Sequence, residues 1–341
     1  PIAVAYAAAV AVQALGEKPE SVEVNVSANI IKNVKSVVVP CTGGLRGIGA
    51  AVCAGIVAGC PEKELEILEE ITGEQKVEMK KMLDPMPMTI RESDKEYIFD
   101  IQIKACAGGH SGYVEIAGFH TNVICVKKDD EIIREKAYEE QGSSCATDRS
   151  LLTVEKIIEF ADCVDVADVE EVLQRQIDYN WAIAEEGMTG NWGAAIGKTL
   201  MEAYGNSVHN RAKAMAAAGS DARMNGCELP VVINSGSGNQ GMTTSLPVIV
   251  YAKELNVSKE MMLRALVVSN LITIHMKTGI GRLSAYCGAI SAGCGAGAGI
   301  CYLYGGRAYE ISHVIVNAVA INSGVVCDGA KASCAAKIAS A

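Results

Sequence analysis

Three cysteines near the end of the chain have types and surroundings that could hold a soft metal centre. Cys287 is followed much later by Cys327, which begins the run Cys-Asp-Gly-Ala-Lys, and Cys334 comes seven residues after that. The residues around them are small and carry little charge. Iron–sulfur clusters are held by cysteine thiolates and tuned by hydrogen bonds and solvent access. The pattern therefore favours iron–sulfur chemistry.

Zinc is the alternative metal for these thiols. Structural zinc sites commonly contain two cysteines separated by two residues, with histidines at characteristic spacings. The sequence has no such cysteine pair. On a helix, Cys327 and Cys334 would lie on one side, almost two turns apart. Cys334 therefore either approaches the same site or faces the core as a buried thiol.

A polar, glycine-broken segment, Asn234–Gly241, precedes these cysteines. It could be a loop that merely interrupts a helix. Yet its glycines would let the backbone approach a ligand, and its short polar side chains offer partners for the carboxylate and ammonium of an amino acid. We expect a substrate loop, with Asn239 and Gln240 as the best candidates and Ser235 and Ser237 beside them.

A second glycine-rich turn, Pro40–Gly49, precedes an apolar helical segment. Such turns can bind phosphate through backbone N–H groups. This one lacks the ending of a P-loop and the glycine spacing of a dinucleotide site. We interpret it as a tight turn near the active site that offers Arg46 to a small carboxylate.

Composition limits the partners of the protein. The chain has 341 residues, which is a soft prior for two domains, and half of the residues are apolar but only 5% are aromatic. Its net charge of −10 argues against nucleic acid, since little counterion release would drive binding to a polyanion. The sequence leaves the oligomeric state open and is compatible with a homo-oligomer.

The thirteen cysteines also bear on the compartment. They are scattered through a chain of ordinary size, with no signal peptide at its start, whereas disulfide scaffolds are short and secreted. We expect a cytoplasmic protein in which most thiols are small core residues. That expectation covers Cys53, Cys60, Cys106, Cys125, Cys145, Cys163, Cys227, Cys294 and Cys301.

Two charge-free stretches, Leu229–Ala252 and Leu283–Gly306, are long enough to raise the question of a membrane. The first is broken by prolines and the polar loop, and the second is rich in Gly, Ala and Ser with few large aliphatic residues. Because irregular backbone is not tolerated against lipid, we interpret both as buried elements of a soluble protein.

Hydrophobic periodicity predicts helices at both ends of the chain and strands between them. Segment 2–15 reads as a buried helix, 21–31 alternates like a strand, and 88–135 reads as a small antiparallel sheet. Further helices are expected at 50–58, 62–71, 74–82, 151–160, 166–186, 192–204, 208–218, 245–255, 258–274, 284–304 and 311–326. The predicted fold is α+β and mainly α, with a helical domain formed by 1–85 and 151–341 and an inserted β-rich domain at 86–150.

Several long motifs carry a family resemblance. They are S-D-A-R-M at 220–224, N-S-G-S-G-N-Q-G at 234–241, R-L-S-A-Y-C-G-A at 282–289, A-G-I-C-Y-L-Y-G-G at 298–306, C-D-G-A-K-A-S-C-A at 327–335 and the opening P-I-A-V-A-Y-A-A-A-V. Together they resemble the L-cysteine desulfidase family, a relative of the iron–sulfur L-serine dehydratase alpha chain. The resemblance runs from end to end.

The resemblance implies a cofactor and its ligands. In the family, three cysteines hold a [4Fe–4S] cluster whose fourth iron is open to the substrate. Two of them correspond by motif to Cys287 and Cys327. The third belongs to a Gly-Cys-Thr-Glu segment that directly precedes the family's Pro-Ile stretch, so it is expected before Pro1, with Cys334 as the less favoured replacement.

Two further groups are candidates for the chemistry. His120, Thr121 and Asn122 are short polar residues in series; a histidine of this kind is usually structural, but the resemblance implies that the triplet faces the cluster site. Lys331 follows Cys327 closely and could remove a substrate proton if burial lowered its pKa. It could equally balance the negative charge of a cluster.

The resemblance implies a carbon–sulfur lyase of cysteine catabolism that converts L-cysteine to pyruvate, ammonia and sulfide, with a small amino acid as substrate. Iron would act as a Lewis acid on the leaving thiolate while a base removes the Cα proton. The same chemistry on L-serine is the nearer alternative, although Gly-Ala-Lys after Asp328 departs from the dehydratase pattern. A cluster-free binding or regulatory protein of the same fold is the farther one.

Overall fold

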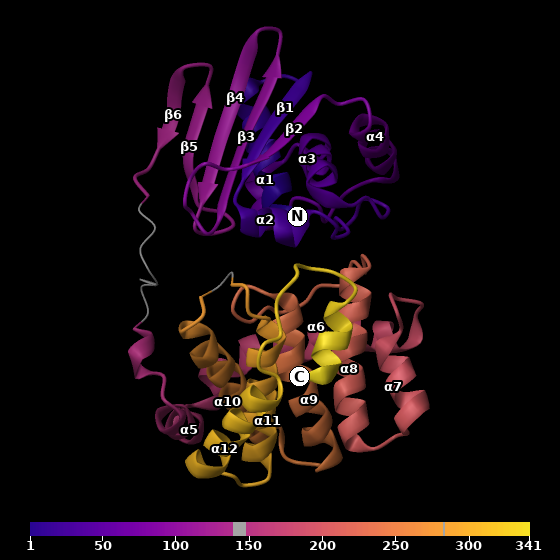
Figure 1. The fold of residues 1–341 in the computed structure, drawn as a ribbon, viewed down its shortest axis with the longest axis vertical. Helices are drawn as coiled ribbons and strands as arrows, with labels where there is room; N and C mark the ends of the chain where they lie inside the picture. Colours follow the sequence, from indigo (N-terminus) through magenta and orange to yellow (C-terminus); the bar gives the residue numbers. More distant parts are fainter. Residues whose placement is uncertain (139–147, 282–283) are drawn as a thin grey trace. The chain divides into compact units, whose positions relative to one another are not determined.

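The computed structural model describes residues 1–138, 148–281 and 284–341. They divide into two compact units, Pro1–Gly142 and Ser143–Ala341 (Figure 1). The first unit combines helices with one sheet, and the elements described in the second are all helices joined by loops. This confirms the predicted α+β, mainly α class. Residues 1–85 lie in the same unit as the strands.

The sheet of the first unit has six strands in the order β2-β1-β3-β4-β5-β6 (Figure 1). Neighbours from β3 to β6 are antiparallel, as expected for residues 88–135, but β1 joins the sheet between β2 and β3 and pairs parallel with β2. The strands are β1 Ser21–Val26, β2 Met88–Glu92, β3 Asp100–Ala107, β4 His110–Ala117, β5 Val123–Lys128 and β6 Glu131–Glu135.

Helix α1, Ile2–Leu15, packs on one face of this sheet. A Cβ atom on Gly112 of β4 would lie 2.1 Å from the carbonyl oxygen of Ala11, so only glycine permits this helix–strand distance. Alanines along α1 and alternate apolar residues of the strands fill the interface. The other helical segments of this unit are α2 Ala28–Val34, α3 Gly47–Ala58, the 3-10 helix η1 Pro61–Glu66 and α4 Gly73–Leu83.

Two of the local predictions in this unit were too long. The strand expected at 21–31 ends at Val26, because Ser27 is the N-cap of a helix that begins at Ala28. The helix expected at 62–71 is a short 3-10 helix in which Glu64 has a positive φ of 46°. Apolar alternation does not show where a strand gives way to a turn.

The second unit is a helical bundle. Its core is formed by aliphatic residues of the central helices α9, α10 and α11 and the helices around them. Gly295 of α11 allows close contact with α10, since a Cβ atom there would lie 2.1 Å from Thr273 Oγ1. The segments are η2 Arg149–Leu151, α5 Val154–Cys163, α6 Val166–Thr189, α7 Ile196–Tyr204, α8 Val208–Met224, α9 Gly238–Glu254, α10 Lys259–Thr278, α11 Gly288–Leu303, α12 Ala308–Ile321 and α13 Cys334–Ser340.

Two helix boundaries in this unit bear on function. Helix α9 begins at Gly238 rather than at the predicted 245, and it continues through Pro247. Helix α13 was not predicted at all. Within the described ranges, no helix is both long enough and apolar enough to span a membrane.

Candidate functional site

An antiparallel bridge between Tyr286 and Val326 brings the two principal cysteines together. The amide of Cys287 donates to Val325 O at 3.1 Å, and the amide of Cys327 donates to Ala285 O at 2.7 Å. Cys287 and Cys327 are thus diagonal neighbours on the same side of a short ladder, a position in which Cα atoms are roughly 7–8 Å apart. Their separation in sequence is closed by backbone pairing.

Cys334 lies close to this pair. It is the first residue of α13, and its thiol points to Gly329 O at 3.7 Å. A charge on Cys334 raises the pKa of Cys287, which reflects their proximity. Nowhere in residues 1–138, 148–281 and 284–341 do three or more His, Cys, Asp or Glu side chains form a group that could hold one metal ion. The three thiols are gathered, but not in the geometry of a mononuclear site.

The protonation of Cys287 depends on opposing effects. Burial raises the pKa of its thiol, whereas the Ala289 N–H and the Lys337 ammonium lower it. Cys287 is the N-cap of α11, where backbone N–H groups point toward a negative charge. The thiolate form is therefore favoured once the negative charge can be shared with a metal.

Lys337 supplies a positive charge next to the thiols. Its ammonium donates to Val326 O at 3.0 Å and forms an ion pair with Asp328. The hydrogen bond from Lys337 to Asp328 is the main reason that the pKa of Asp328 is lowered to about 2. Lys331, the sequence-predicted base, donates to the other oxygen of Asp328 at 3.2 Å. Asp328 thus holds two lysines beside Cys327.

The polar segment 234–241 is part loop and part helix. Ser237 is the N-cap of α9 and accepts from the amide of Gln240 at 3.5 Å. Ser235, with a φ of 49°, donates to Asn234 Oδ1 at 2.8 Å. Asn234 in turn donates to Asn270 Oδ1 at 2.9 Å. The two serines therefore shape the turn, and the residues after it lie in the first turn of a helix.

Asn239 and Gln240 are positioned by different neighbours. Arg223 of α8 donates to Asn239 Oδ1 at 3.0 Å. A Cβ atom on Gly238 would lie 2.6 Å from Arg223 Nε, so this glycine makes room for the guanidinium. Burial lowers the pKa of Arg223, and the nearby Cys334 opposes that effect. Arg223 therefore links the first turn of α9 to the thiols.

Gln240 lies against the helix that begins after Cys287. A Cβ atom on Gly288 would be 2.4 Å from Gln240 Nε2, so the amide rests directly on this backbone. Gln240 Oε1 is buried and has no hydrogen-bond partner among the residues described. Buried carbonyl oxygens normally have a donor. Gln240 Oε1 is thus a buried acceptor that the described chain leaves without a donor.

The remaining predicted site residues belong to the first unit. His120, Thr121 and Asn122 form the turn between β4 and β5, where the His120 ring packs at a tilt of 59° against Phe99, with centroids 4.8 Å apart. Asn122 donates to Ala117 O at 2.8 Å and accepts from Lys136 at 3.1 Å. Arg46 is exposed at the start of α3 and donates to Ser36 O at 3.3 Å. Their expected roles at the cluster site stay predictions.

The other cysteines differ in exposure. Cys53 and Cys294 are fully buried, and burial raises the pKa of each thiol to about 11, as expected for inert core residues. Cys60 and Cys163 are exposed, which differs from the core position expected for most thiols. Cys145 lies outside the described residues. The twelve described cysteines are free.

Sequence reasoning missed Arg223 and Lys337. Arg223 stands in the motif Ser-Asp-Ala-Arg-Met, where a lone cation among small residues was the available signal. Lys337 follows Cys334 by three residues, which is the spacing of neighbours on one helix face. That spacing could indicate a contact only if helix α13 had been predicted.

Comparison with known proteins gives a consistent assignment. The family profile named serine dehydratase alpha chain matches residues 62–341. The UPF0597 protein of Desulfitobacterium hafniense is 58% identical over 341 residues, which cover this whole chain and 79% of that protein. UPF0597 proteins of Lachnoclostridium phytofermentans and Treponema denticola are 51% and 44% identical, again across this whole chain and 82% and 80% of theirs.

Proposed function

Because this chain belongs to the serine dehydratase alpha chain family, we propose that it is a carbon–sulfur lyase that depends on a [4Fe–4S] cluster and acts on L-cysteine. L-cysteine and water would give pyruvate, ammonia and hydrogen sulfide. The Cα proton leaves, the Cβ–S bond breaks, and the enamine that results hydrolyses without help. The free cysteines are compatible with a reducing cytoplasm, which we propose as the compartment.

The observation that carries this proposal is the diagonal placement of Cys287 and Cys327 beside fixed positive charge. Soft thiolates suit iron, and Lys337 and Arg223 offset the negative charge of a thiolate-bound cluster. A cluster is larger than one ion, so its ligands need not meet at one point. The residues present therefore fit such a group, with Cys287 and Cys327 as ligands and Cys334 nearby.

When bound, the cluster would supply a Lewis-acidic iron for the leaving sulfur of the substrate. The protein groups would bind and orient the amino acid. Gln240 Oε1, which lacks a partner in the described structure, would accept from the substrate ammonium. Arg223, already hydrogen-bonded to Asn239, would bind the carboxylate. Ser235 and Ser237 would hold the turn in shape.

The proton at Cα needs a base, and we propose Lys331 Nζ. Its contact with Asp328 at 3.2 Å is the longer of the two lysine contacts with that carboxylate. Lys337 is bound to Asp328 and to Val326 O, so it would stay charged and balance the thiolates. In this arrangement Lys331 would take the Cα proton of the substrate.

L-serine dehydration is the second candidate, and the name of the matching family favours it. The two reactions differ only in the leaving group, hydroxide in place of hydrosulfide. The same binding residues would serve both. The choice depends on how the site treats a sulfur or an oxygen at Cβ.

The test uses the full-length protein reconstituted anaerobically with iron and sulfide. We expect a broad visible absorption that bleaches in air, together with sulfide and pyruvate released from L-cysteine in equal amounts. Pyruvate from L-serine at a higher kcat/KM would favour the dehydratase. A colourless protein that releases neither product would contradict both reactions and favour a cluster-free binding protein.

A further inference from the structure

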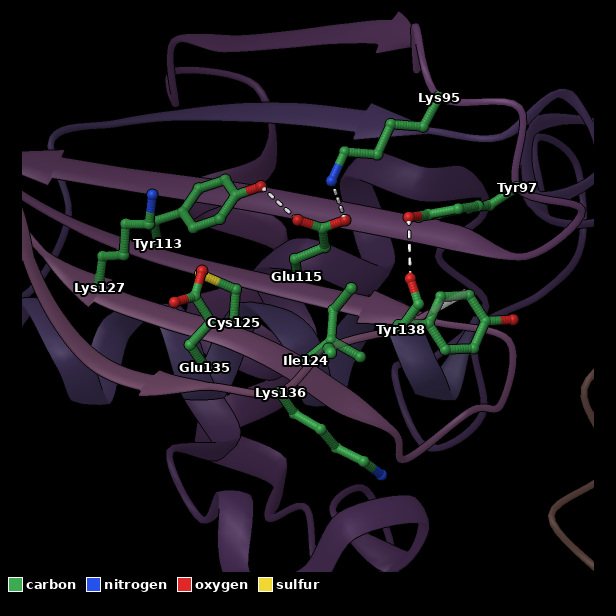
Figure 2. A pocket seen from close by; sticks show the side chains of 11 residues that line it. Lys95, Tyr97, Tyr113, Glu115, Ile124, Cys125, Lys127, Glu135, Lys136 and Tyr138 are labelled. Atoms are coloured by element: carbon green, nitrogen blue, oxygen red, sulfur yellow. Dashed lines mark hydrogen bonds and ion pairs between the residues drawn. The ribbon is translucent and has the colours of Figure 1, made fainter. Parts of the chain in front are cut away.

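A polar pocket of about 670 Å³ lies in the first unit, on the face of the sheet opposite α1. Strand β4 directs Gly112 and Val114 toward α1, so Tyr113 and Glu115, which alternate with them, lie on the other face. The close view in Figure 2 shows these side chains with those of Lys95 and Lys127 around one space.

The floor of the pocket contains a buried carboxylate. Glu115 is 5% exposed although it lies on the face away from α1, which in many antiparallel sheets is solvated. Lys95 forms an ion pair with one of its oxygens, and Tyr113 OH donates to the other at 3.2 Å (Figure 2). A buried charge persists only when paired in this way. The floor is therefore a polar surface formed by a buried carboxylate and its two partners.

The rim of the pocket carries charges of both signs. Lys127 lies with its ammonium 5.8 Å from the centroid of the Tyr113 ring, and Lys136 donates to Asn122 at 3.1 Å. Among the residues that the structure describes, neither Lys127 nor Glu135 forms an ion pair. Figure 2 shows the ammonium groups of Lys127 and Lys136 on opposite sides of the pocket. Since Lys95 neutralises Glu115 and Lys136 is bonded to Asn122, Lys127 is the cation left to meet a single negative charge.

An aromatic wall closes one side. The rings of Tyr97 and Tyr138 meet edge to face, with centroids 5.1 Å apart and planes at 89°. Tyr97 OH donates to Tyr138 O at 3.4 Å, a contact drawn in Figure 2. The two tyrosines come from the segment before β3 and the segment after β6, so they join separate parts of the chain. Such rings provide rigid apolar surface for a ligand body.

We propose that this pocket binds a small organic carboxylate. Its anionic end would meet Lys127, and its apolar body would extend toward Tyr97 and Tyr138. Glu135 decides between two members of the class. An amino acid would place its ammonium on Glu135, whereas a 2-oxo acid, which has no ammonium, would gain nothing from that carboxylate. The site uses none of the residues assigned above to the lyase reaction.

Calorimetric titration of the whole protein with L-leucine and with its 2-oxo acid, 4-methyl-2-oxopentanoate, tests the proposal. Neither probe carries a leaving group at Cβ, so neither can react by elimination. We expect one or both to bind, and Lys127→Met to weaken binding about tenfold or more, because a charge-assisted hydrogen bond is lost. Lys128→Met removes the same charge from the neighbouring residue, which does not line the pocket, and should leave binding unchanged.

The Glu135→Gln variant distinguishes the amino acid from the 2-oxo acid as the ligand of the pocket. It should weaken L-leucine if the amino acid is the ligand, and it should leave the oxo acid unchanged or tighter, since a repulsive charge is removed. Far-UV circular dichroism of each variant checks that the sheet is intact. The proposal would be overturned if neither probe bound at roughly millimolar concentration. It would also be overturned if the Lys127→Met and Lys128→Met variants bound the probe equally well.

Discussion

The thiol of Cys287 lies between burial, which favours the neutral form, and a lysine and a backbone N–H, which favour the thiolate. Neither influence alone makes a reactive or metal-binding cysteine. Cys53 and Cys294 also have a backbone hydrogen bond but no lysine beside them, and burial raises the pKa of each thiol to about 11. The difference at Cys287 is the nearby Lys337, which a list of cysteines could not indicate.

Replacing either proposed ligand should remove the metal. We expect Cys287→Ser or Cys327→Ser to lower the iron content after anaerobic reconstitution about tenfold or more, because serine is a poor ligand for iron in a cluster. Iron and acid-labile sulfide assays measure this directly. Cys163→Ser, at an exposed thiol of α5, is the matched control and should retain full iron. Equal iron in all three variants would contradict the ligand assignment.

A single methyl group should disturb the contact between Gln240 and the start of α11. In Gly288→Ala the new Cβ would lie 2.4 Å from Gln240 Nε2, so the amide must move. We expect a loss of about 1–3 kcal/mol in the free energy of unfolding, the usual cost of overpacking. Gly279→Ala places its methyl in open space with φ near −77° and should be close to neutral. Urea denaturation compares the two, and equal stabilities would refute the contact.

At the scale of elements, short pieces of backbone do the positioning. The bridge between Tyr286 and Val326 sets the two cysteines side by side, and the first turn of α13 adds Cys334 and, three residues later, Lys337. Helix α9 begins at Gly238, so Asn239 and Gln240 have helical geometry rather than loop freedom. A binding side chain on a helix is held more firmly than one on a loop.

Strand β3 begins with a buried carboxyl that should make the stability of the first unit depend on pH. Asp100 is fully buried; Gln102 donates to Oδ2 at 2.7 Å, and Oδ1 has no partner within the described chain. Burial raises the pKa of Asp100, although hydrogen bonds from Ser93 and Gln102 oppose this. Between the unfolded pKa and this raised value, the folded state binds more protons, so the Asp100 contribution to stability improves as pH falls.

The comparison of wild type with Asp100→Asn isolates this effect. At neutral pH the wild type carries an unfavourable buried charge that the variant lacks. We expect the free energy of unfolding of the wild type, relative to Asp100→Asn, to rise as the pH is lowered from about 7 toward about 4. Urea denaturation at several pH values measures it. A difference between the two proteins that does not change with pH would contradict the prediction.

At the scale of the whole molecule, composition excludes one class of partner. The net charge is −10, and the rim of the sheet pocket is a small, mixed patch rather than a basic face. We expect the protein to pass an immobilised heparin column without retention at about 150 mM salt, where surface charges are screened beyond about 8 Å. Retention that disappears at higher salt would reveal a basic surface that the sequence does not indicate.

The sequence by itself determined what depends on local pattern and on long motifs. Apolar periodicity gave helix 2–15 with the bounds that the structure has, and it gave the strands of 88–135 and most helices of the second unit. The motifs indicated a relative of the serine dehydratase alpha chain, and the comparisons confirm that family. The sequence signals for secondary structure were weakest where turns and short helices have similar residue compositions. This was the case at 27–34, 61–71 and 334–340.

Only the tertiary structure decided which residues meet. The amides of Cys287 and Cys327 each donate to the other's segment, which is far away in sequence, and no local pattern encodes such pairing. The contact of Gln240 with Gly288 and the approach of Lys337 to Cys287 arise in the same way, from packing between elements. Residue types state what chemistry is available. Long-range packing and pairing decide which of those groups share a site, because their free energy depends on the whole fold.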